Sequence, residues 1–250
     1  MKKKIIAKIK SSDIEIQAYK ELADKLEQLP ISKDEILLNI PLFLTRSSLS
    51  HILFFNDIYS KIINKPGVIM EFGSRWGRNL SLMISLRSIF EPYNITRRIL
   101  GFDTFKGIPH VSKKDKNSKL MEVGSLNVSK DYDKFLDSLL SCQEKLSPRP
   151  NLKNYQLMKG DALKTLPKYL KDNPETIVSL VYFDLVNYRP TKKILSLIKK
   201  NMVKGGIIAF DDFMLDEAPG ETIAFKEEIG LKNYTLHRSP YSSTSVYFVI

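Results

Sequence analysis

The stretch VIMEFGSRWGRNLSLM, residues 68–83, combines an apolar run, an acid and two spaced glycines. The apolar run ends at Glu71, and glycines follow at positions 73 and 77, after which apolar residues recur at helical spacing. This order predicts a buried strand, a tight turn and a helix. Gly73 permits a turn with positive φ, and Gly77 permits close approach at the helix start. Such a turn either binds a nucleotide or is only a tight strand–helix corner.

The glycine spacing limits which nucleotide this turn could bind. Gly73 and Gly77 form G-x-x-x-G, which lacks the close glycine pair of the dinucleotide fingerprint G-x-G-x-x-G. The carboxylate of Glu71 would repel a phosphate and favour an ammonium. S-adenosylmethionine (SAM), with its α-ammonium, sulfonium and adenosine, therefore fits the turn. A nicotinamide-dependent oxidoreductase is disfavoured for the same reasons.

From residue 67 onward, short apolar strands alternate with helical segments, which predicts a parallel sheet with crossover helices. The expected strands are VIMEF (68–72), RRILGFD (97–103), YQLMKGD (155–161), VSLVYFD (178–184), GGIIAFDD (205–212) and SVYFVI (245–250). We expect the last strand to join an edge of the sheet, where it could run antiparallel.

Five of these strands end at or near an acid, and open α/β sheets bind ligands beyond the carboxyl ends of their strands. Asp103 suits the two ribose hydroxyls, Asp161 suits the adenine amine, and Phe105 could stack on the base. The next two strands end at Asp184 and Asp211. A helix N-cap is the structural alternative for each acid. It could account for one or two of them, but not for the whole ordered set.

We expect a helical cap over residues 1–65 and one α/β domain over residues 66–250. The segment 110–130 is polar and long for a connection, which is typical of a lid or of disorder. The length of 250 residues and the 43% hydrophobic content fit this organisation, although two small domains would also fit.

The N-terminal region predicts two helices. One spans residues 13–30, and the other spans residues 47–64 with Ser47 and Ser48 as candidate N-caps. His51 lies beside the apolar stripe of the second helix, which favours a partly buried structural histidine over a catalytic one.

Composition excludes several classes of protein. A single cysteine, Cys142, excludes an internal disulfide framework and Cys-based metal sites, and we interpret it as a packing residue. The net charge of +11 could indicate nucleic acid binding, but the lysines are scattered and no arginine-rich stripe with aromatics occurs. No run reaches the roughly 18 to 20 apolar residues of a membrane span, and the start lacks a secretory h-region. We therefore expect a cytoplasmic protein.

Six segments resemble, in their order along the chain, the macrocin O-methyltransferase (TylF-type) family. They are EFGSRWGRNLSLM (71–83), FDTFKGIP (102–109), KGDALKTLP (159–167), YFDLVNYRPTKKIL (182–195), VKGGIIAFDDF (203–213) and PGETIAFKEE (219–228). The resemblance covers residues 67–230. It implies the Rossmann-like class I methyltransferase fold, a mostly parallel seven-stranded sheet with an antiparallel final strand. It also implies SAM-dependent O-methylation of a small polyhydroxylated metabolite, such as a sugar of a glycosylated natural product or of a surface glycan.

The resemblance also assigns roles to residues of this chain. The cofactor-binding residues it implies are Arg46, Glu71, Gly73, Ser74, Gly77, Asp103, Thr104, Phe105, Asp161, Ala162 and Asp184. The carboxylates of Asp184, Asp211 and Asp212 would hold Mg²⁺, which prefers oxygen ligands. Such a metal would hold two substrate hydroxyls and lower the pKa of one of them.

Two features leave the chemistry open. The family usually reads Asp-x-Asp-Leu-Tyr before Pro-Thr, whereas here Val186 replaces the second acid, so metal dependence stays undecided. The candidate catalytic residues are Asp184, His110 and His237, although an ordinary surface position is favoured for both histidines until geometry decides.

Three alternatives remain beside the O-methyltransferase. A nucleic-acid methyltransferase would use the basic surface, but no Asn/Asp-Pro-Pro-aromatic motif follows the fourth strand. A non-catalytic SAM-binding interaction protein stays open because of Val186 and the unassigned base. An oxidoreductase shares only the fold. We expect a small hydroxylated acceptor as partner, and a homodimer formed through the N-terminal helices.

Overall fold

The structure is a computed structural model that describes residues 12–116, 118 and 120–250. The chain divides into two compact units, Met1–Ser50 and His51–Ile250. In the described part of the chain, no helix is both long enough and apolar enough to cross a bilayer.

The first unit is helical. It contains α1 (Asp13–Glu27), α2 (Lys33–Leu38), the 3₁₀ helix η1 (Ile40–Phe43) and the start of α3 (Arg46–Ser60). Ser12 caps α1 through a capping box with Glu15. The expected caps of α3 were wrong: the helix begins at Arg46, and the Thr45 hydroxyl accepts the N–H of Ser48 at 3.1 Å. The cap is thus the threonine before the serine pair, because an N-cap side chain bonds the N–H groups of the following turn.

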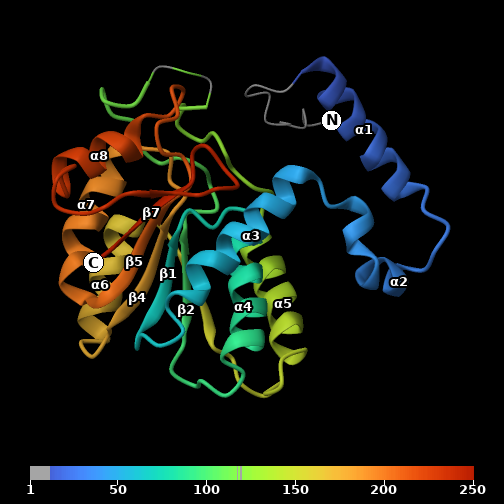
Figure 1. The fold of residues 1–250 in the computed structure, drawn as a ribbon, viewed down its shortest axis with the longest axis horizontal. Coiled ribbons are helices and arrows are strands. Elements are labelled where there is room, and N and C mark those ends of the chain that lie inside the picture. Colours follow the sequence, from blue (N-terminus) through green and yellow to red (C-terminus); the bar gives the residue numbers. More distant parts are fainter. Residues whose placement is uncertain (1–11, 117, 119) are drawn as a thin grey trace. The chain divides into compact units, whose positions relative to one another are not determined.

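The second unit contains a seven-stranded sheet in the order β3-β2-β1-β4-β5-β7-β6 (Figure 1). The strands are β1 (Val68–Phe72), β2 (Ile99–Asp103), β3 (Tyr155–Lys159), β4 (Val178–Phe183), β5 (Met202–Phe210), β6 (His237–Arg238) and β7 (Val246–Val249). β1 to β5 pair in parallel, and β7 runs antiparallel to both β5 and β6. The expected fold class is confirmed. The expected edge position of the last strand was wrong, because the two-residue strand β6 covers it.

Helices pack on both faces of this sheet (Figure 1). One face carries α3, α4 (Arg78–Phe90) and α5 (Tyr132–Lys145). The other carries α6 (Ala162–Asp172), α7 (Tyr188–Ile198) and α8 (Gly220–Glu228), and the short helix η2 (Lys199–Asn201) follows α7. β1 is buried along its whole length, so its side chains alternate between two apolar cores.

Cys142 was wrongly interpreted as a packing residue, because it is exposed on α5. The buried face of α5 is formed by Leu136, Leu140 and Glu144, which recur at intervals of four residues. Cys142 falls between the last two and therefore lies off this face.

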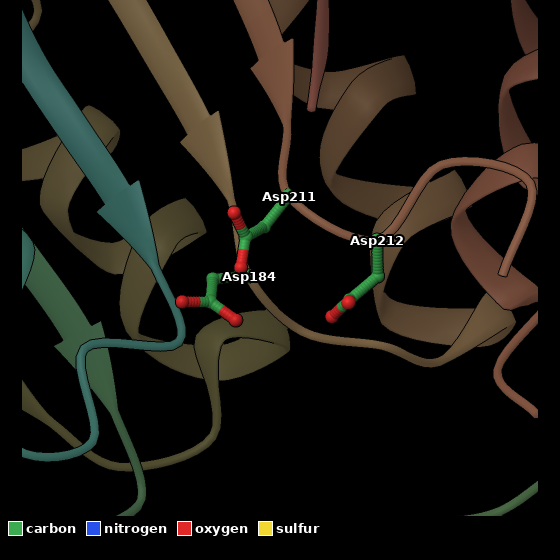
Figure 2. A group of neighbouring side chains, drawn as sticks. All are labelled: Asp184, Asp211 and Asp212. Carbon is green, nitrogen blue, oxygen red and sulfur yellow. The ribbon is translucent and has the colours of Figure 1, made fainter. Parts of the chain in front are cut away.

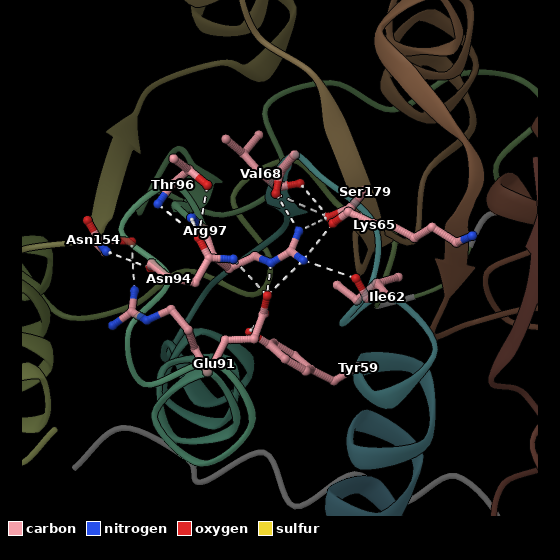
Figure 3. Close-up of polar contacts among 12 residues, drawn as sticks. Tyr59, Ile62, Lys65, Val68, Glu91, Asn94, Thr96, Arg97, Asn154 and Ser179 are labelled. Atoms are coloured by element: carbon pink, nitrogen blue, oxygen red, sulfur yellow. Dashed lines mark hydrogen bonds and ion pairs between the residues drawn. The ribbon is translucent and has the colours of Figure 1, made fainter. Parts of the chain in front are cut away.

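A buried arginine ties together the strand ends opposite the carboxyl edge (Figure 3). Arg97, 1% exposed, precedes β2. Its guanidinium donates to the Glu91 carboxylate, to the Ser179 hydroxyl and to the carbonyl oxygens of Ile62, Lys65 and Gly67. Glu91 also accepts the hydroxyl of Tyr59 at 2.7 Å. These bonds join α3, β4 and the segments next to α4 and β1 at the edge of the sheet opposite the carboxyl ends.

Candidate active site

The end of β1 buries a carboxylate without hydrogen-bond partners. Glu71 is 0% exposed, and neither of its oxygens has a hydrogen-bond partner in the described structure. Burial raises the pKa of Glu71 to about 7, and polar contacts with the side chains of Ser74 and Asn79, which do not reach hydrogen-bond geometry, lower it only in part. Buried polar groups are normally paired. An unpaired carboxylate at this turn is therefore suited to a cationic group of a ligand.

The two glycines of the turn allow close contacts with other segments. Gly73 has φ +98°, and a Cβ there would lie 2.0 Å from the carbonyl oxygen of Asp184. Gly77 has φ +77°, and its Cβ would lie 2.3 Å from Leu136 of α5. A side chain at either position would be both strained and obstructed. The turn is therefore in backbone contact with the loop that follows β4.

Asp103, at the end of β2, holds the two neighbouring turns. Its Oδ2 accepts the N–H of Arg75 at 2.7 Å, and its Oδ1 accepts the N–H of Phe105 at 2.5 Å. Both donors belong to non-glycine residues with positive φ, 44° and 55°. Burial raises the pKa of Asp103, and the bonds from the N–H groups of Arg75 and Phe105 oppose that rise. Each oxygen keeps a lone pair that could accept a ribose hydroxyl.

The residues beside Asp103 point in other directions. Thr104 donates its hydroxyl to the Gly107 carbonyl oxygen at 2.8 Å. Phe105 is 7% exposed and belongs to the core on the α3–α5 face of the sheet. Ring stacking of Phe105 on a base therefore stays a prediction.

The end of β3 borders a cavity of about 430 Å³. It is lined by Thr104, residues 106–109, residues 123–124 and residues 159–161. Asp161 caps α6 by accepting the N–H of Leu163 at 2.9 Å, and Ala162 opens that helix. His110 Nε2 lies 3.9 Å from Asp161 Oδ2. The structure thus places His110 at the β3 end of the site.

The ends of β4 and β5 bring three carboxylates together (Figure 2). One oxygen from each of Asp184, Asp211 and Asp212 lies within 4.8 Å of the others. Burial raises the pKa of Asp184 and of Asp212 well above the ordinary value, and repulsion from Asp211 adds to both shifts. Asp211 Oδ1 also accepts the Tyr182 hydroxyl at 2.7 Å. A divalent cation would relieve this repulsion, and oxygen donors suit Mg²⁺.

A polar chain, not foreseen from the sequence, connects α3 and α4 to this group. Asn79 donates from Nδ2 to Asp184 Oδ2 at 3.3 Å, and its Oδ1 lies 2.6 Å from His51 Nε2. Arg78 Nη2 is 3.4 Å from His51 Nδ1. Burial lowers the pKa of His51, and the charge of Arg78 adds to that effect. The sequence did contain a signal for the role of Asn79. It is a polar residue that follows the glycine turn at the buried start of a helix.

A second buried glutamate, Glu221 of α8, was also not foreseen. It is 0% exposed, and its Oε1 accepts the N–H groups of Leu185 at 2.9 Å and Val186 at 3.1 Å. Its Oε2 accepts the N–H of Asp212 at 3.4 Å. Burial raises the pKa of Glu221 to about 8, the bond from Leu185 opposes this, and the neighbouring charge of Asp184 adds to it.

Val186, which stands where the related family has a second acid, points into an apolar cluster. It is 4% exposed and packs with Ile108, Met121 and Ala218. Asp115 joins the same loop to residues 110–116, because its Oδ1 accepts the N–H of Tyr188 at 2.7 Å. This bond ties residue 115 to the start of α7, and the lid or disorder expected for the segment 110–130 stays a prediction.

Two candidate site residues lie in other surroundings. His237 is exposed on β6, and its ring stacks on that of Tyr247 with centroids 5.0 Å apart. Arg46 belongs to the first unit, where its exposed guanidinium lies 3.7 Å from Glu15.

Comparison with solved structures finds matches along nearly the whole chain. CalS11, a calicheamicin methyltransferase, has 37% identity and a TM-score of 0.93, over 96% of this chain and 93% of that chain. An apo structure of CalS11, described as a TDP-rhamnose 3′-O-methyltransferase in calicheamicin biosynthesis, has 34% identity and a TM-score of 0.84, over 96% and 95%. The O-methyltransferase NovP, at 18% identity and a TM-score of 0.61 over 80% and 79%, shares the fold. A scan against protein-family models found no match, and no curated protein sequence matches.

Proposed function

The chain belongs to the macrocin O-methyltransferase (TylF-type) family of class I SAM-dependent methyltransferases, and on this basis we propose that it methylates a hydroxyl of a sugar. The observation that carries this proposal is the bond from Asn79 to Asp184 at 3.3 Å. It links the cofactor turn after β1 to the three carboxylates at the ends of β4 and β5. A methyl donor and a hydroxyl acceptor bound at these two places would be neighbours.

The first acceptor to test is TDP-rhamnose, on which the similar enzyme CalS11 acts. The related class of acceptor is a hydroxylated sugar bound to a nucleoside diphosphate or to a natural product. SAM and such nucleotide sugars are cytoplasmic metabolites, and we propose the same location for this enzyme. We propose a helical cap over residues 1–65 and a methyltransferase domain over residues 66–250, although the compact units divide earlier, at Ser50, because the rest of α3 packs on the sheet.

The residues around the β1 turn fit SAM. Glu71, buried and unpaired, would accept the α-ammonium, and Asp103 would accept the ribose hydroxyls with its remaining lone pairs. Asp161 and Ala162 would face the adenine at the β3 end. SAM supplies a sulfonium methyl group that leaves by in-line displacement, so the protein contributes mainly by positioning.

The three carboxylates of Asp184, Asp211 and Asp212 fit Mg²⁺. When bound, Mg²⁺ supplies a Lewis acid that lowers the pKa of a coordinated hydroxyl. Asp184 is fixed by Asn79 through one oxygen, which leaves Oδ1 free to take the hydroxyl proton. Asp184 is preferred as the base because His110 lies beside Asp161 and His237 lies on the edge strand β6.

Calorimetry and a rate assay test this function. We expect S-adenosylhomocysteine (SAH) to bind, and [methyl-³H]SAM to label TDP-rhamnose in the presence of Mg²⁺. No SAH binding at millimolar concentration would refute the methyltransferase assignment. Labelling that persists in EDTA would remove the metal from the proposal, and labelling of bulk RNA instead of sugars would favour the nucleic-acid alternative.

We further propose a homodimer formed through the first unit. α1, α2 and η1 bury no side chain, and they expose large apolar residues such as Ile14 (81%), Leu37 (74%) and Leu38 (78%). Exposed apolar patches of this kind mark interfaces. Light scattering after size exclusion should give twice the chain mass, and Leu37→Glu with Leu38→Glu should give the monomer mass. A monomeric wild type would refute the dimer.

A further inference from the structure

The first turn of α8 contacts both loops that carry the acid group. At Gly220 an added Cβ would lie 2.4 Å from the Tyr188 backbone nitrogen, so only glycine allows this approach to the β4–α7 loop. Glu221 follows directly, with Oε1 bonded to the backbone after β4 and Oε2 bonded to the N–H of Asp212 after β5. One side chain therefore connects the two strand ends.

Side chains of this first turn of α8 also accept hydrogen bonds from two strained residues in the neighbouring loops. Val186 has φ 60° and Met214 has φ 58°, and both are non-glycine residues in the left-handed region. For a β-branched residue such as Val186 this conformation is an outlier. Glu221 accepts the N–H of Val186, and the Thr222 hydroxyl accepts the N–H of Met214 at 2.7 Å. Strain of this kind persists only where the surroundings enforce it.

Filling space does not account for a carboxylate at this position. Glu221 is 0% exposed and pairs with no lysine or arginine among the described residues. A buried carboxylate without a cation is unfavourable, and an apolar side chain would fill the same volume. A carboxylate differs from the alternatives in having two acceptor oxygens, which here face two separate loops.

We propose that Glu221 is a positioning residue that fastens the loop after β4 to the loop after β5. It thereby sets the separation between the carboxylate of Asp184 and those of Asp211 and Asp212. Only the consequence for Mg²⁺ affinity rests on the proposed function. The fastening itself concerns the two loops and can be measured without metal.

The fastening is tested by hydrogen exchange of the metal-free protein, measured by mass spectrometry over residues 184–188 and 211–214. In Glu221→Gln the amide oxygen still accepts the bonds of Leu185 and Val186, but its NH₂ faces the N–H of Asp212. Exchange should rise about 10-fold over 211–214 only, the effect of losing roughly one hydrogen bond. In Glu221→Ala it should rise in both segments.

Glu228→Gln is the matched control, because Glu228 lies on the same helix and pairs with Lys199 at 2.8 Å. It should leave both segments unchanged. Wild-type exchange in both segments of a folded Glu221→Ala would overturn the proposal. If Glu221→Ala does not fold, wild-type exchange over 211–214 in Glu221→Gln would overturn it.

Calorimetric titration with Mg²⁺ tests the consequence for the carboxylates. We expect Glu221→Gln to weaken Mg²⁺ binding by about 10- to 100-fold, as residues that orient metal ligands commonly do. Unchanged Mg²⁺ affinity would show that Glu221 does not set the carboxylate separation. If the wild type itself binds no Mg²⁺, the metal part of the proposed function fails, while the exchange result decides on the fastening separately.

Discussion

Two glutamates are fully buried at the carboxyl edge of the sheet, and they differ in what surrounds their oxygens. Glu71, at the end of β1, has no hydrogen-bond partner among the residues that the structure describes, whereas Glu221, in α8, accepts three backbone N–H groups. Burial raises the pKa of both, to about 7 for Glu71 and to about 8 for Glu221. Burial and pKa therefore do not separate these two glutamates, whereas hydrogen-bond satisfaction does. On the proposals above, the unpaired carboxylate binds a ligand group and the bonded carboxylate positions two loops.

Arg97 extends the comparison to the opposite edge of the sheet, since it is as buried as the glutamates and fully bonded. Arg97→Met should lower the free energy of unfolding by about 3–5 kcal/mol, because Glu91 would remain as an unpaired buried charge. Urea denaturation measures this loss. SAH affinity at low temperature should match the wild type. A loss of unfolding free energy below about 1 kcal/mol would show that a buried charge with all its hydrogen bonds formed need not stabilise the fold.

Asp184 offers a second comparison, with a carboxylate proposed to act as both base and metal ligand. Asp184→Asn should reduce the rate of methyl transfer by at least about 100-fold, since it removes both a proton acceptor and a metal ligand. Mg²⁺ affinity should fall in parallel while SAH affinity is retained. Asp172→Asn, at an exposed acid ending α6, is the control. A rate within a few-fold of the wild type would exclude Asp184 as the base.

Glu71→Gln tests the unpaired glutamate as a ligand group. SAM affinity should fall by about 10-fold, because the bond to the α-ammonium loses its charge assistance. Mg²⁺ affinity should stay unchanged, in contrast to Glu221→Gln. Calorimetry measures both, with the exposed Glu175→Gln as control. Equal SAM affinity in variant and wild type would mean that Glu71 does not contact the cofactor.

The same variant, Glu71→Gln, tests a predicted pH dependence of the stability of the wild type. The pKa of Glu71 is raised from 4.5 to about 7, so the folded state binds more protons in this window and wild-type stability falls as the pH rises through it. At about 1.4 kcal/mol per unit the whole shift corresponds to about 3 kcal/mol. Burial of the amide in the variant changes its stability by the same amount at every pH, so it does not alter this trend. Glu71→Gln should therefore gain about 2–3 kcal/mol on the wild type between pH 5 and pH 8, and a constant difference would contradict the raised pKa.

The sequence was sufficient for most of the fold, because alternating apolar strands and helical segments leave few arrangements. β6 was missed because a two-residue exposed strand, His237–Arg238, has no hydrophobic pattern. Thr45 was missed as a cap because the serines after it have the same capping chemistry. In both cases several local conformations fit the sequence, and contacts with the surrounding structure select one of them.

At the site, the sequence indicated which acids end strands, and the structure brings Asp184, Asp211 and Asp212 together as expected. It could not reveal Glu221, because a glutamate in the first turn of a helix is the ordinary complement to the helix dipole. Nor could it decide between a catalytic and a surface role for His110 and His237, since the surroundings of loop and edge residues depend on long-range contacts. Their roles, and the ligand assignments of the other site residues, stay predictions.

Gly73 has a consequence for how this enzyme can diversify. Its α-carbon lies so close to the Asp184 carbonyl that any side chain would push the cofactor turn and the acid-bearing loop apart. The turn after β1 and the loop after β4 therefore cannot shift independently, and a change in one must be accommodated by the other. If the donor binds at this turn and the acceptor at the carboxylates, as proposed, a relative could change its acceptor through segments outside this contact and keep the two binding places in register.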